Sequence, residues 1–183
     1  SETLGESFCV LFGIADEERA AKVISSMHVG EFGPPIFSPQ IVSQGDYHNN
    51  GAWPYVTSFW GKAAAKAGNE TALMHALACN VRTASLYATN YENYSFNTGN
   101  PYTTLINSPN MLWGLSGFMG LFHRTFFGLE FTQEGLAMKP FVPTVLAGTR
   151  KLEAFPYRGM QLDITVSGSG NEIASCLVDG KEA

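Results

Sequence analysis

Two long stretches rich in glycine, proline and asparagine constrain this sequence most, because they interrupt an otherwise helical pattern at residues 28–51 and 89–110. Neither stretch can continue a helix, since proline removes a backbone donor and glycine is costly to order. Each is longer than the ~12 to 15 residues beyond which an unstructured connection is uncommon in a compact domain. Loops of that length are functional or disordered, and the interleaved Phe32, Phe37 and Ile41 argue against disorder. The sequence therefore predicts two functional loops.

Helical patterns surround these loops. Residues 3–14 carry apolar side chains at helical intervals, and Asp16 is placed to cap a second helix. A further helix is expected from Pro54 to Gly68, and Asn69 should cap another of ~20 residues. The segment 111–127 predicts a strongly apolar helix with almost no polar face, so we expect other elements to cover most of it.

The periodicity changes from residue 129 onward. Residues 129–138 predict a hairpin, and the segments 160–166 and 173–178 alternate as two strands around a turn at 168–171. Asp179 and Gly180 predict another tight turn. The tail is therefore expected to be β-structured, without helix.

Repeated helical hairpins joined by long loops are the pattern of an α/α toroid. We expect a mainly α fold, with the hairpins of a partial (α/α)6 barrel in residues 1–128 and a small β-rich segment in residues 129–183. These hairpins are fewer than a closed ring needs. The sequence is therefore interpreted as the C-terminal part of a longer protein, truncated at both ends. Its open side would associate with itself or pack with an upstream segment.

The composition argues against several classes of protein. A formal net charge of -5, with 11 Lys and Arg and no basic cluster, disfavours binding to nucleic acid or to an anionic membrane surface. No apolar run reaches the ~20 residues of a membrane span. Cys9, Cys79 and Cys176 are expected to be buried thiols, and the histidines have no metal-ligand spacing. We expect neither a metal site nor a cofactor.

The stretch from Gln44 to Pro54 has the chemistry of a surface that binds a polyhydroxylated ligand. Amides and carboxylates make paired hydrogen bonds to neighbouring hydroxyls, and aromatic rings offer flat apolar faces. The alternative is a loop whose polar groups satisfy its own backbone. The candidate sugar-binding residues here are Gln44, Asp46, Tyr47, His48, Asn49 and Trp53.

This stretch, Gln-Gly-Asp-Tyr-His-Asn-Asn-Gly-Ala-Trp-Pro, resembles the trehalase signature Gln-Trp-Asp-Tyr-Pro-Asn-Gly-Trp-Ala-Pro. The segment 91–94, Tyr-Glu-Asn-Tyr, is similar to the segment that carries the general base in the same enzymes. With the apolar helix after Pro109, these loops resemble the six-hairpin inverting glycosidases, which include the trehalases and the mannosyl-oligosaccharide glucosidases. The resemblance extends over residues 1–145. It departs from the family pattern at Asn50, which is an insertion, and at Asn93, which replaces a lysine.

The resemblance implies hydrolysis of an α-linked disaccharide or oligosaccharide with inversion. Inverting glycosidases use two carboxyl groups about 6.5 to 9.5 Å apart, one as general acid and one to activate a water. By resemblance Glu92 is the general base, and Tyr91 and Tyr94 hold its carboxylate and contact the substrate. Asp46 either accepts a hydrogen bond from a sugar hydroxyl or orients neighbouring groups in the sugar subsite. These families carry the general acid on an upstream hairpin, outside this sequence.

Two other functions remain open at this point. One is a non-catalytic carbohydrate-binding protein of the same fold, and the other is a glycoside phosphorylase, which the lack of a basic, glycine-rich anion site disfavours. Glu92 could also be a loop carboxylate that caps the backbone, with Asp46 as the next catalytic candidate. From the reaction class we expect a secreted or periplasmic protein.

Overall fold

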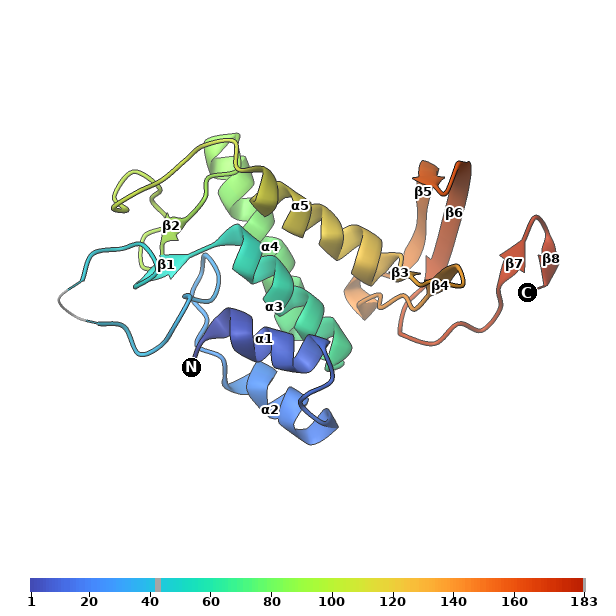
Figure 1. Cartoon of the computed structure of the whole chain (residues 1–183), viewed down its shortest axis with the longest axis horizontal. Helices are drawn as coiled ribbons and strands as arrows, with labels where there is room; N and C mark the ends of the chain where they lie inside the picture. The colour runs from blue at the N-terminus through green and yellow to red at the C-terminus, as the bar shows by residue number, and fades with distance from the viewer. Residues whose placement is uncertain (42–43, 183) are drawn as a thin grey trace. The chain divides into compact units, whose positions relative to one another are not determined.

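The computed structural model describes residues 1–41 and 44–182, which divide into two compact units. One unit is Ser1–Leu121, and the other begins at Phe122. The division falls within the segment expected to form one apolar helix, because α5 (Leu112–Leu121) gives way to a π-helical turn, Phe122–Phe126. Both candidate loops belong to the first unit (Figure 1).

The first helical hairpin forms as the sequence predicts, from α1 (Thr3–Leu11) and α2 (Glu17–Ser26). Asp16 caps α2, since its carboxylate accepts a hydrogen bond from the Arg19 amide at 2.8 Å. The hairpin ends at Met27, where the chain enters the first long loop.

Helix α3 (Pro54–Lys66) is the central helix of the first unit and packs against α1, α4 (Glu70–Tyr87) and α5. Its buried positions include a run of small residues around Gly61. A Cβ atom on Gly61 would lie 2.8 Å from the Cβ of Ala76 in α4, which is closer than real Cβ atoms approach. The close packing of α3 on α4 therefore depends on the missing side chain.

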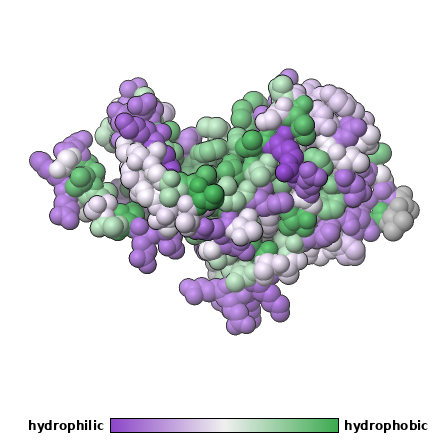
Figure 2. Space-filling view, turned by 180° about the vertical axis from the view of Figure 1, so that it is seen from behind, coloured by the Kyte–Doolittle hydropathy of each residue, from purple (hydrophilic) through white to green (hydrophobic). Residues whose placement is uncertain are grey.

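Helix α5 packs on α3 through glycines. Gly114 and Gly117 are buried, and a Cβ on Gly117 would lie 3.2 Å from the Cβ of Ser58. The expected cover of α5 is incomplete within the described residues, because four of its apolar side chains are between 40% and 76% exposed: Leu112, Trp113, Leu115 and Met119. Hydrophobic areas also lie among hydrophilic ones on the face drawn in Figure 2. None of the described helices combines the length and hydropathy needed to cross a bilayer.

The second unit contains the π-helical turn, antiparallel hairpins and a 3-10 helix, Thr144–Leu146. This 3-10 helix is a short helical turn in a tail that was expected to have no helix. The hairpins are β3 (Leu129–Phe131) with β4 (Leu136–Met138), β5 (Gly148–Tyr157) with β6 (Met160–Gly168), and β7 (Leu177–Val178) with β8 (Lys181–Glu182). The expected pairing of 160–166 with 173–178 is wrong, because β6 pairs with the preceding β5. Arg158 and Gly159 have φ of 46° and 80°, and this backbone makes the tight turn between β5 and β6.

The expected fold class is also wrong. The described residues form five α-helices and four two-stranded sheets, with 39% helix and 22% strand, which is a mixed α/β fold instead of a mainly α toroid. One reason is that α1, α4 and α5 all pack around α3, whereas the hairpins of a toroid lie side by side around an axis. Another is that the strands β1 (Gly51–Ala52) and β2 (Tyr94–Ser95) form a sheet within the helical unit.

The packing of α4 gives a direct test of this core. Leu73 is 0% exposed and Leu86, on the same helix, is 61% exposed. We expect Leu73→Ala to lower the free energy of unfolding by about 2 to 5 kcal/mol, because it removes buried methyl groups and leaves a cavity. Leu86→Ala should change it by less than about 1 kcal/mol. Urea denaturation of both variants measures the difference, and equal losses would contradict the packing described.

Candidate functional site

A two-stranded sheet joins the first loop (residues 28–51) to the second loop (residues 89–110). β1 pairs antiparallel with β2, with Ala52 opposite Tyr94. The contact continues beyond the strands, because the Phe96 amide donates to the Asn50 carbonyl at 2.8 Å. The Leu105 amide likewise donates to the Asp46 carbonyl at 2.9 Å. The two loops that the sequence singled out therefore form one surface.

The two loops enclose an open, polar recess of about 580 Å³. Three candidate sugar-binding residues line it: Gln44, Asp46 and Asn49. The other lining residues were not among the predicted site residues, and they are His28, Gln40, Ile41, Asn50, Phe96 and Asn97. Asp46 is the one carboxylate among these lining residues, which include no Lys or Arg. Such a lining suits a hydroxyl-rich ligand without negative charge.

Two polar atoms of this recess lack a partner in the described part of the chain. Asp46 accepts a hydrogen bond at its Oδ1 from the side-chain amide of Asn50, 2.8 Å away, and its Oδ2 has no donor among the described residues. The Nε2 of Gln40 has no acceptor among the described residues, but this atom is buried and is not accessible to a ligand in the recess. The recess thus offers one unused acceptor, the Asp46 Oδ2, which a sugar hydroxyl can satisfy.

Asn49 lines the recess, but its side-chain amide makes hydrogen bonds with the backbone of the loop. Its Oδ1 accepts from the Ile41 amide at 2.7 Å, and its Nδ2 donates to the carbonyls of Ile41 and Gln44 at 3.1 and 3.0 Å. The side chain is buried. Both donors are therefore occupied, and Asn49 holds the loop in shape.

Tyr47, His48 and Trp53 form an aromatic cluster, with both other rings 5.1 Å from the Trp53 ring. Trp53 is 4% exposed, donates from Nε1 to the Tyr47 carbonyl at 3.0 Å and packs edge-on against Trp113. His48 is exposed and Tyr47 half-buried. Trp53 thus supports two rings whose faces a ligand can reach.

Glu92 does not line the recess, although it belongs to the same pair of loops. Its backbone amide donates to the Ser108 carbonyl at 2.9 Å. Its side chain is half-buried and makes no hydrogen bond or ion pair with any described residue. A carboxylate in this condition is available to a water or a ligand.

Tyr91 and Tyr94 belong to a tyrosine cluster with Tyr87 and Tyr102. Tyr94 is buried and its hydroxyl accepts from the Tyr91 amide at 3.2 Å, and burial raises the pKa of its phenol. Tyr91 donates its hydroxyl to that of Tyr102 at 3.2 Å, which raises the pKa of Tyr91. Both phenols therefore remain protonated at neutral pH.

One face of α4 holds the start of the first loop. His75 Nε2 lies 2.9 Å from the Gly30 carbonyl, while Cys79 Sγ and Arg82 Nη1 donate to the Glu31 carbonyl at 3.3 and 2.6 Å. Burial raises the pKa of the Cys79 thiol to about 12. This face of α4 thus fixes the segment that leads into the recess.

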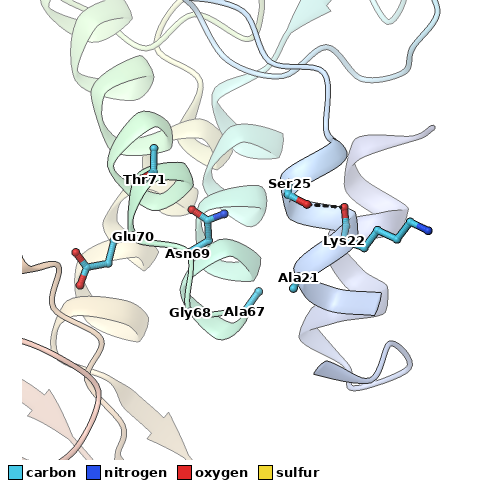
Figure 3. Close-up of a pocket in the computed structure, with 8 residues that line it drawn as sticks. All are labelled: Ala21, Lys22, Ser25, Ala67, Gly68, Asn69, Glu70 and Thr71. Atoms are coloured by element: carbon cyan, nitrogen blue, oxygen red, sulfur yellow. Dashed lines mark hydrogen bonds between the residues drawn. The ribbon is translucent and has the colours of Figure 1, made fainter. Parts of the chain in front are cut away.

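A second hollow, of about 670 Å³, lies between α2 and the turn that joins α3 to α4. Its polar groups serve the helices, since the Asn69 side chain accepts from the Ala72 amide and the Ser25 hydroxyl donates to the Lys22 carbonyl. Figure 3 shows the Lys22 side chain pointing away from Asn69 and Gly68. Among described residues no group of three His, Cys, Asp or Glu is placed to hold a metal ion. The recess is therefore the stronger candidate site.

The role of Asn49 can be tested with an isosteric change. We expect Asn49→Asp to lower the free energy of unfolding by about 2 to 3 kcal/mol, because two buried donors are lost and a carboxylate oxygen then faces two carbonyls. The same change at the exposed Asn171 should have little effect. Chemical denaturation of both variants measures this, and an unaltered Asn49→Asp protein would refute the structural role.

The raised pKa of Cys79 predicts a dependence of stability on pH. The unfolded thiol loses its proton near the ordinary pKa of 9.0, whereas the folded thiol keeps it to about 12. Its contribution to stability is complete below pH 9 and declines between pH 9 and 12, so wild type should lose about 1 kcal/mol more than Cys79→Ala between pH 8 and 10. Unfolding free energies at both pH values decide this, with Cys9→Ala as the control. Equal losses in wild type and Cys79→Ala would show that Cys79 is accessible to solvent.

The structure thus arranges the candidate residues in three groups: the recess with Gln44, Asp46 and Asn49, the aromatic cluster of Tyr47, His48 and Trp53, and Glu92 flanked by Tyr91 and Tyr94. The function proposed below depends on the side chains of these groups. No known protein family matches the sequence, and no curated protein matches it either.

Proposed function

We propose that the protein is a glycoside hydrolase that cleaves an α-linked glycan with inversion, and that Glu92 is its general base. The observation that carries this proposal is the half-buried Glu92 carboxylate, which has no partner among the described residues and stands on the loops that form a hydroxyl-compatible recess. The resemblance of segments 44–54 and 91–94 to the six-hairpin glycosidases supports the same function.

The chemistry requires a carboxylate that takes a proton from a water as the water attacks the anomeric carbon. A second carboxyl group gives its proton to the leaving oxygen on the opposite face. Glu92 suits the first task because no described residue donates a hydrogen bond to its oxygens. The resemblance places the general acid on an upstream hairpin, and we assign it to none of the described residues.

Sugar binding is assigned to the recess and to the two accessible rings beside it. Gln44, Asp46 and Asn97 supply amide and carboxylate groups, while Tyr47 and His48 supply faces for stacking. Asn49, Trp53 and Tyr94 support these groups from buried positions. This arrangement is typical of ligand sites, in which buried side chains hold in place the polar groups that contact the ligand.

Hydrolysis of a disaccharide panel by the natural full-length protein tests the proposal. The panel contains trehalose, maltose and the α-1,2- and α-1,3-linked mannobioses. We expect one of them to be cleaved with release of the β-anomer, and Glu92→Gln to lower kcat by about 100-fold or more. Glu134→Gln, at an exposed position, is the matched control and should leave kcat unchanged.

Each alternative has its own outcome. If Glu92→Gln retains kcat, the general-base assignment is overturned and Asp46 becomes the next candidate. If cleavage requires inorganic phosphate and yields a sugar phosphate, the protein is a phosphorylase. If a glycan binds and none is cleaved, the protein is a carbohydrate-binding protein.

A further inference from the structure

The recess and Glu92 lie toward opposite ends of β2. Phe96 and Asn97 follow this strand and line the recess, whereas Glu92 precedes it. Glu92 is not among the residues that line the recess, so a sugar held there does not contact the Glu92 carboxylate.

A general base must reach its substrate directly or through one water. The water that Glu92 activates consequently attacks an anomeric carbon next to Glu92, and a sugar unit in the recess is not the one whose bond is broken. A binding site displaced from the catalytic carboxylate has a use only when the substrate extends from one to the other.

The recess has the features of a site for one sugar unit. It contains the Oδ2 of Asp46, an acceptor that no described residue uses. His28 and Phe96 add a pair of rings with centroids 5.1 Å apart, which offers an apolar edge for a sugar face. Asn97 is exposed at the rim and makes no hydrogen bond within the described chain.

We propose that this recess binds a sugar unit remote from the cleaved bond, so that the substrate is an oligosaccharide longer than a disaccharide. The inference depends on the proposed function, because it takes Glu92 as the site of cleavage. The lining carries one carboxylate and no Lys or Arg, so the remote unit carries no negative charge.

The dependence of kcat/KM on chain length tests this inference. The substrates are the members with two to five units of the maltose and α-mannobiose series of the panel above. Trehalose has no longer members, because its bond uses both anomeric carbons, and cleavage of trehalose alone overturns the inference. For wild type we expect kcat/KM to rise by about 10-fold or more from the disaccharide to the longest member, since the added unit gains hydrogen bonds and stacking. Asn97→Ala should lower, by about 5-fold, the ratio of kcat/KM for the longest member to kcat/KM for the disaccharide.

Asn171→Ala is the matched control, because Asn171 is also exposed and lies outside the recess. Thermal midpoints of all variants verify folding, and a folding defect would lower turnover of short and long substrates alike. Constant kcat/KM across the series, or an equal loss for all lengths in Asn97→Ala, overturns the remote subsite.

Calorimetric binding of the same series to Glu92→Gln separates this inference from the proposed function. If Glu92→Gln retains hydrolysis, the proposal that Glu92 is the general base is contradicted, whatever the binding data show. If this variant is inactive and binds the longest member no more tightly than the disaccharide, the inference about the recess fails and the general base stands. We expect affinity to rise with length and Asn97→Ala, added to Glu92→Gln, to cancel most of that rise.

Discussion

The small side chains along α3 are the condition on which the first unit depends. A central helix can be approached closely on several sides only where no bulky residue keeps its neighbours apart. Gly61, Ala63 and Ala64 provide this on α3, and Ala76 on α4 and the glycines of α5 provide the matching surfaces. Because α3 begins directly after β1, its fixed position also determines where the first loop returns to the core.

The two loops keep their shape through amide side chains that replace regular backbone pairing. Asn49 does so in the first loop. Asn107 does so in the second, where its Nδ2 donates to the carbonyls of Asn93 and Pro101 at 2.7 and 2.8 Å. Side chains of this kind can satisfy backbone groups that no sheet or helix pairs. Much of the polar composition of the loops is therefore structural, and only the remaining polar groups are available to a ligand.

The sequence was sufficient to predict α1 to α4, because strong helical periodicity coincides with side-chain caps such as Asp16 and Asn69. It could not predict the fold class, since the arrangement of helices around α3 depends on tertiary packing that periodicity does not encode. Strands of two residues, such as β1 and β2, carry no readable alternation, so the contributions of His28, Gln40, Phe96 and Asn97 to the recess were missed. The β5 strand was missed because its turn places Arg158 at positive φ, a position usually taken by Asn, Asp or Gly.

Gly30 shows how a residue outside the recess can govern its form. Its φ lies outside the left-handed region, so the backbone itself would accept alanine, but a Cβ atom there would lie 2.6 Å from the ring of Phe96. A methyl group at this position would displace that ring from the segment held by His75. The depth of the recess is thus controlled by a side chain that is absent, and substitutions at position 30 offer a way to reshape a ligand site without altering any group that lines it.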